Sequence, residues 1–276
     1  MSTVMKDRPL EMVARTAHQS APIKLWAVVG VVVVAIIVNA VFQWVTSDFF
    51  RPSPVGADPV PWSTLFLIRV LEIGGSIGAL SMIWVFLLRP ILRTRELSWD
   101  GMLLLICFSM WIQDPMDDYF NFTFSYNAYF INMASWAVYL PGWSSPRHEF
   151  YPEPIIFMGG MYIWFVFGFS ILGCWVLNKC RTAWMPEQSV LTHLAVVLAS
   201  LAALDLVIEV VCIRQQLFAY SGAVRAWSLW PGTPHQFPLY ESILIGLLCT
   251  ALTAFRYFRD DRGLSFAEKG DRKSVV

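Results

Sequence analysis

The sequence has little charge and no excess of either sign. Of its 276 residues only 14% are charged, and 20 Lys and Arg balance 20 Asp and Glu. A soluble domain has about 25% charged residues, so this chain lacks the polar side chains that a water-exposed surface needs. The middle of the chain has no basic block, which excludes the electrostatic footprint of a nucleic-acid-binding protein.

Cysteine is also scarce, and its five copies are scattered along the chain. No two of them form a CxxC pair, and most lie inside apolar runs. The cysteines are Cys107, Cys174, Cys180, Cys212 and Cys249. This distribution argues against both a disulfide scaffold and a zinc site.

Apolar residues make up 57% of the chain and gather in long runs. About 20 mostly apolar residues suffice for a helix to cross a bilayer. We therefore predict an all-α, polytopic membrane bundle of six spans in a single domain over residues 1–276. The predicted spans are 25–45, 62–88, 101–120, 155–177, 190–212 and 240–257. They form a bundle over residues 25–257, between an N-terminal segment (1–24) and a tail (258–276).

The distribution of Lys and Arg predicts the orientation of these spans. Basic segments stay on the cytoplasmic side, and both ends of the chain and every second connection are rich in Lys and Arg. The alternate connections contain only Arg51, Arg147, Arg214 and Arg225. We expect a protein integral to the plasma membrane with both termini in the cytoplasm.

Residues 119–146 contain no charge but many polar side chains. A seventh span here would invert every later span and export the basic tail. We predict instead a re-entrant or interfacial hairpin after the third span, on the outer side. Such backbone is tolerated at membrane depth only where protein or a water-filled cavity satisfies its polar groups.

Ionisable side chains fall inside or at the ends of four predicted spans. Each costs about 2.5 to 3.5 kcal/mol on insertion, so such groups are functional candidates. We predict six catalytic carboxylates: Asp114, Asp117, Asp118, Asp205, Glu209 and Glu72. All are predicted in the outer half of the bundle, with Arg69 as the only cation among them. Crowded carboxylates cannot all ionise, and a neutral acid beside a carboxylate suits general acid/base chemistry.

Each of these candidates also has a structural interpretation. Arg69 and Glu72 could simply neutralise one another. Asp117 and Asp118 could be solvated at the interface, and Glu241 could complement a helix dipole.

A substrate-binding wall is predicted from aromatic and polar residues near the outer segment. Aromatic faces can line an apolar pocket and stabilise a cation. The predicted binding residues are Arg69, Trp111, Tyr119, Asn121, Tyr126, Asn127, Trp136 and Glu241.

The segment 117–121 (DDYFN) is loosely similar to aspartate-rich motifs that hold magnesium and a diphosphate. The chain has no second motif of this kind and no Arg/Lys cluster for the diphosphate. We therefore predict neither a metal nor a cofactor.

Several sequence motifs resemble actinobacterial membrane proteins of the AveC-like spirocyclase family. They are WIQDPMDDYFNFTFSYNA at 111–128, SW at 135–136, PGW at 141–143, PEP at 152–154 and GGMY at 159–162. The resemblance covers approximately residues 25–257 and implies a multi-span protein. It also implies the chemistry of the typifying member, which closes a spiroketal on a polyketide and is linked to a dehydration there.

The residues suit this chemistry, and we predict a cofactor-independent cyclase of secondary metabolism, a lyase or isomerase. Its partners would be the bilayer and a hydrophobic polyketide- or terpenoid-like substrate. The neutral acid would be Asp114 or Asp118. Asp205, Glu209 and Glu72 would supply counter-charge and base, with Arg69 fixing Glu72.

Two alternatives stay open, and the sequence does not indicate an oligomeric state. One is an integral-membrane terpene cyclase that protonates an epoxide or alkene, although such proteins are similar to seven-span bundles. The other is a non-enzymatic lipid- or sterol-binding protein, or a subunit of a transport complex.

Overall fold

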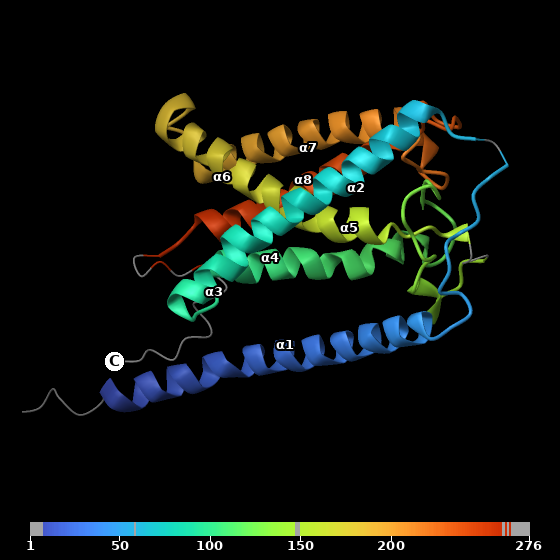
Figure 1. Cartoon of the computed structure of the whole chain (residues 1–276). Helices are drawn as coiled ribbons and strands as arrows, with labels where there is room; N and C mark the ends of the chain where they lie inside the picture. The colour runs from blue at the N-terminus through green and yellow to red at the C-terminus, as the bar shows by residue number, and fades with distance from the viewer. Residues whose placement is uncertain (1–7, 58, 147–149, 261–262, 264, 266–276) are drawn as a thin grey trace, which may run out of the picture.

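Long apolar helices dominate the computed structural model (Figure 1). The structure describes residues 8–57, 59–146, 150–260, 263 and 265, with side chains from residue 25 onward. Of the predicted cytoplasmic segments, residues 8–24 form the first part of α1, whereas most of 258–276 lies outside the described residues. Five helical segments are long and apolar enough to cross a membrane, which is compatible with a membrane protein.

These five segments correspond to five of the predicted spans, and two of them contain π-helical turns. The first lies within α1 (Arg8–Val45), and the second joins α2 (Trp62–Met82), η1 (Ile83–Leu88) and α3 (Arg89–Thr94). The third joins α5 (Ile155–Met161), η5 (Tyr162–Phe167), α6 (Gly168–Lys179) and η6 (Cys180–Trp184). The last two are α7 (Val190–Arg214) and α8 (Leu239–Tyr257).

The remaining predicted span, 101–120, does not form one regular helix. It divides into α4 (Trp99–Met110) and the 3₁₀ helix η2 (Trp111–Asp118). Pro115 lies inside η2 and has no N–H to donate, so the α-helical hydrogen-bond pattern cannot continue there. In Figure 1 α4 nevertheless runs between the same two ends of the bundle as its neighbours. It points in the same direction as α1 and α7, so the alternation of directions along the chain is kept.

Residues 119–146 form an irregular loop region at one end of the bundle (Figure 1). They contain only the short strand β1 (Ser125–Tyr126) and the 3₁₀ helix η3 (Ala137–Tyr139). β1 pairs antiparallel with β2 (Phe218–Ala219), which follows α7. A second short pair, β3 (Ser228–Leu229) with β4 (Phe237–Pro238), precedes α8. The location of this loop at a membrane interface stays a prediction.

Small residues allow the helices to approach closely at several positions. A Cβ atom on Gly75 of α2 would lie 2.8 Å from Nε1 of Trp164, and one on Gly246 of α8 would lie 2.9 Å from Cβ of Ala202. Small residues at such contacts are typical of membrane helices, which associate mainly through close packing.

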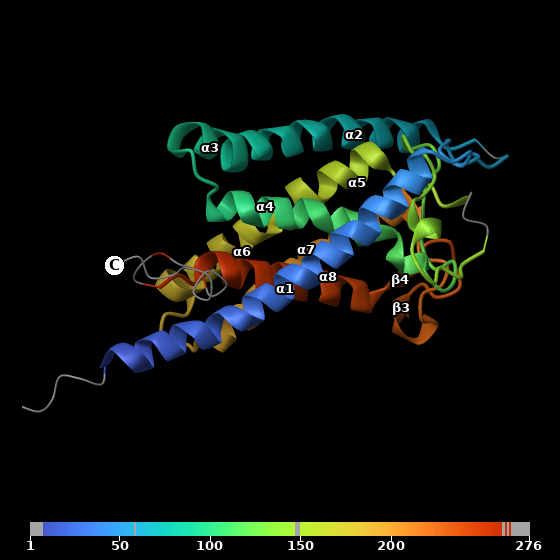
Figure 2. The same cartoon turned by 90° about the horizontal axis from the view of Figure 1, so that it is seen from below.

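Helix α1 stands apart from the other helices and crosses them obliquely (Figures 1 and 2). Its apolar side chains are mostly exposed, and its attachment lies at its C-terminal end. There Trp44 packs edge-on against Trp136 at 5.4 Å, and its Nε1 donates to the carbonyl of Met133 at 2.9 Å. The helix is thus fastened to the loop region rather than along its length.

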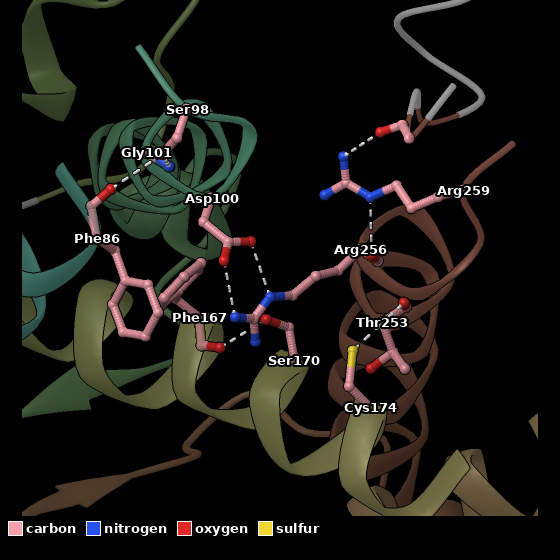
Figure 3. A network of polar contacts seen from close by, with 11 residues as sticks. Phe86, Ser98, Asp100, Gly101, Phe167, Ser170, Cys174, Thr253, Arg256 and Arg259 are labelled. Carbon is pink, nitrogen blue, oxygen red and sulfur yellow. Dashed lines mark hydrogen bonds and ion pairs between the residues drawn. The ribbon is translucent and has the colours of Figure 1, made fainter. Parts of the chain in front are cut away.

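At the opposite end of the bundle, a charged network joins α4 to α8 (Figure 3). Arg256 donates two parallel hydrogen bonds to Asp100, from Nε at 2.9 Å and from Nη2 at 3.0 Å. Its guanidinium also lies 5.6 Å from the ring centre of Phe86 and 5.2 Å from that of Phe167. The pair therefore ties the end of α8 to the start of α4.

We predict that Arg256→Lys lowers the free energy of unfolding by about 1 to 3 kcal/mol, because an ammonium group cannot replace two parallel hydrogen bonds. Thermal unfolding in detergent measures the effect. The exposed Arg93→Lys is the matched control. Equal melting temperatures for the two variants would contradict the prediction.

Candidate active site

A largely apolar cavity of about 1040 Å³ lies between α1 and the rest of the bundle, at the end that carries the loop region. One wall consists of α1 side chains between Trp26 and Val38. Other walls come from η2, β1, α5, η5, α7, β2 and α8. The cavity is large enough for a drug-sized or larger ligand. Its aromatic lining residues include Phe124, Phe157, Phe165 and Phe218.

Carboxylates from three helical segments enter this cavity. They are Asp114 and Asp117 from η2, Asp205 and Glu209 from α7, and Glu241 from α8. Among the described residues that line the cavity, none is Lys, Arg or His. The predicted convergence of acidic groups on a single pocket therefore holds for these five.

Asp114 is held by two tyrosines. Tyr162 donates its hydroxyl to Oδ1 at 2.7 Å, and Tyr126 donates to Oδ2 at 2.9 Å. Burial raises the pKa of Asp114 to about 6, although the two hydrogen bonds favour the ionised form. The ionised neighbour Asp117 raises this pKa further. Asp114 can therefore exchange a proton near neutral pH from a fixed position.

The two carboxylates of α7 lie four residues apart and so share one helix face. Glu209 accepts a hydrogen bond from the hydroxyl of Tyr220 at 3.1 Å. Asp205 is completely buried, and neither of its carboxylate oxygens has a hydrogen-bond partner. A buried carboxyl group without partners is costly in free energy.

Asp118 faces away from the large cavity and organises the loop that follows η2. Its Oδ1 accepts hydrogen bonds from the backbone N–H groups of Thr123 at 2.7 Å and Phe124 at 2.9 Å, and from the Thr123 hydroxyl at 3.3 Å. Burial raises the pKa of Asp118 to about 6.

Arg69 and Glu72 also lie outside the lining of the large cavity. They form an ion pair on α2, and both reach the loop region. Glu72 accepts a hydrogen bond from the backbone N–H of Ile131 at 2.7 Å, and Arg69 donates to the carbonyl of Tyr129 at 3.0 Å. These contacts support the structural interpretation, in which the pair fastens the loop to α2.

Of the other predicted binding residues, Tyr126 and Glu241 line the cavity. Trp111 and Trp136 pack together at 5.0 Å beside it, and Asn127 binds the carbonyl of Gln216 at 2.8 Å. Tyr119 donates to the carbonyl of Pro141, and Asn121 is exposed. The structure thus places these four aromatic and amide side chains in the loop framework and Asn121 on its surface.

Three site residues were missed from the sequence. Tyr162 and Tyr220 hold Asp114 and Glu209, and Glu153 is a buried carboxylate close to Asp114. Glu153 stands between two prolines directly before an apolar run, and Tyr162 is a hydroxyl inside that run. Both are local signals, but neither reveals the partner it meets in the fold.

No group of three or more His, Cys, Asp or Glu among the described residues is placed to hold a metal ion. The arrangement instead offers proton donors and acceptors around an apolar space. It suits acid/base chemistry on a hydrophobic molecule.

Comparisons with known proteins give one match. The family described as Spirocyclase AveC-like matches residues 94–275, a region that contains η2, β1 and every helix from α4 to α8. No curated protein and no solved structure matches the chain.

The site and its framework should respond differently to the loss of one charge. We predict that Arg69→Met lowers the unfolding temperature and exposes residues 119–146 to proteolysis, because Glu72 loses its cation. Asp205→Asn should leave the unfolding temperature unchanged or raise it, because its carboxylate has no partner to lose. Thermal unfolding and limited proteolysis in detergent test both variants. A larger loss of stability in Asp205→Asn than in Arg69→Met would refute this division.

Proposed function

Because this chain belongs to the spirocyclase AveC-like family, we propose that it is a membrane-embedded cyclase of secondary metabolism. Its substrate is a hydrophobic polyketide-like or terpenoid-like molecule that enters from the bilayer. The observation that carries the proposal is the apolar cavity with five carboxylates and no cation among its described lining residues. In this proposal the protein is integral to the plasma membrane, with both termini cytoplasmic.

Spiroketal formation needs only proton transfers and stabilisation of one cation. The hydroxyl of a cyclic hemiketal takes a proton and leaves as water, which generates an oxocarbenium ion. A second hydroxyl of the same molecule then attacks this carbon and loses its proton. The product is lighter than the substrate by one water, and nothing is oxidised or reduced. The scheme needs neither metal nor cofactor.

Asp114 is the proposed acid. It lines the cavity, titrates near neutral pH, and two tyrosine hydroxyls fix its position. A fixed acid is effective because the proton is delivered without reorientation of the donor.

Glu209 and Asp205 are the proposed base and counter-charge. Their position in the same cavity allows one to accept the proton of the attacking hydroxyl while the others stabilise the positive charge. The aromatic faces of Phe124, Phe157 and Phe218 would add to this stabilisation.

We predict that deletion of the gene from its native host causes a lipid-soluble precursor to accumulate that is heavier than the product by one water. The wild-type gene should restore the product, whereas Asp114→Asn and Glu209→Gln should lower its formation by about 100-fold or more, as expected for loss of a general acid or base. Mass spectrometry of extracts measures both compounds.

The matched controls are Asp48→Asn and Glu187→Gln, which remove exposed carboxylates outside the cavity and should leave product formation unchanged. A precursor of the same mass as the product would favour isomerising terpene cyclisation. No change in any small molecule would count against an enzyme and favour a binding protein.

A further inference from the structure

A second, much smaller void lies behind Asp114. Its volume is about 10 Å³, and Asp114, Asp118 and Glu153 all line it. This is about the space that one water molecule needs, and such a water requires two to four polar partners. The three carboxyl groups provide them.

Glu153 lines this void next to Asp114, with which its carboxyl group shares a hydrogen bond. The residue is only 4% exposed, and Oε1 has no hydrogen-bond partner. None of the described residues around the void is a cation that could compensate an ionised carboxylate. Burial raises the pKa of Glu153, and the neighbouring Asp114 raises it further. Both effects favour the protonated form of Glu153.

Asp114, Phe124 and Tyr126 separate the void from the large cavity, because all three line both. On the void side the carboxyl of Asp114 meets Glu153, and on the cavity side it meets the substrate space. The titratable groups that face it are Tyr126, Tyr162, Asp117 and Glu153. Asp118 contributes from the far side of the void, since all of its hydrogen bonds to described residues use Oδ1 and leave Oδ2 available.

We propose that Glu153, Asp118 and one water molecule in this void form a proton relay that reloads Asp114 after each turnover. The relay rests on the proposed function of Asp114 as the acid. Asp114 gives its proton to the departing hydroxyl and becomes a carboxylate. Glu153 then passes a proton through the water to Asp114, Asp118 replaces the proton of Glu153, and Asp118 takes up one proton from solvent. The base in the cavity releases to solvent the proton that it took from the attacking hydroxyl, so the number of protons on the protein is the same before and after the cycle.

The first test compares the pH dependence of turnover for wild type and Glu153→Gln, with the accumulated precursor as substrate. In wild type Asp114 loses its proton as the pH rises through about 6, and Glu153, whose pKa is raised, supplies a replacement above that pH; Glu153→Gln removes this supply. We expect the alkaline limb of the variant to move to lower pH. Its rate should fall about tenfold for each pH unit above that limb, and it should approach the wild-type rate below it. Glu153→Asp should restore part of the shift.

A loss of rate by the same factor at every pH would overturn the relay, since that result indicates a merely structural role. Glu187→Gln, which removes an exposed carboxylate, is the control for the substitution itself. Asp118→Asn keeps an acceptor oxygen for the loop but loses the proton, so it should show a smaller shift in the same direction.

Infrared spectroscopy of the purified protein tests the relay without any substrate. At neutral pH the protonated carboxyl absorption of the wild type should contain one component that is absent in Glu153→Gln. In Asp114→Asn this component should disappear at lower pH than in wild type, because Glu153 has lost a negative neighbour. If Glu153→Gln fails to fold, Asp114→Asn alone decides: an unshifted component would refute the coupling. If the carboxyl absorption changes as expected but the protein cyclises no substrate, the proposed function is refuted, whereas the coupling between Glu153 and Asp114 stands.

Discussion

Burial of carboxylates without cations is the constraint on which the rest of this structure depends. Asp114, Asp205 and Glu209 stand around an apolar space, and no described lining residue neutralises them. Such groups avoid ionising together, and they take whatever hydrogen bonds are offered. Tyrosine hydroxyls from η5, β1 and the segment after β2 meet this need. A hydroxyl donates to a carboxylate without adding positive charge, so the site remains able to stabilise a cation.

The irregular loop region positions two of these hydroxyls, one directly and one through its strand pairing. β1 carries Tyr126 to Asp114, and its partner β2 leads to Tyr220 beside Glu209. The loop itself is fastened to the membrane helices, to α2 through the ion pair of Arg69 and Glu72 and to α1 through tryptophan packing. The charged residues that the sequence suggested for catalysis therefore fall into two groups. Some line the cavity, and others fasten the loop region to α2.

The sequence predicts the helices well because hydrophobic length is a local property. Five of the six predicted spans are long apolar helices. The remaining one, 101–120, is interrupted where Pro115 and its neighbouring aspartates stop regular α-helix formation. Acidic side chains in apolar runs likewise indicated Asp114, Asp205 and Glu209. The sequence does not show which residues, far apart along the chain, lie close together in the fold. Glu153 lies 39 positions from Asp114 in an unremarkable loop, and the role of Glu72 depends on a backbone N–H of Ile131.

The carboxylates of the cavity also bear on which molecules could enter it. In the proposed membrane location, phospholipids and free fatty acids would surround the protein and outnumber any secondary metabolite. Their phosphate and carboxylate heads would be repelled by ionised groups that have no counter-cation nearby. Uncharged ketones, alcohols and lactones meet no such barrier. In the proposed cyclase, the absence of Lys and Arg among the described lining residues would therefore disfavour ordinary anionic lipids and favour neutral polyoxygenated chains.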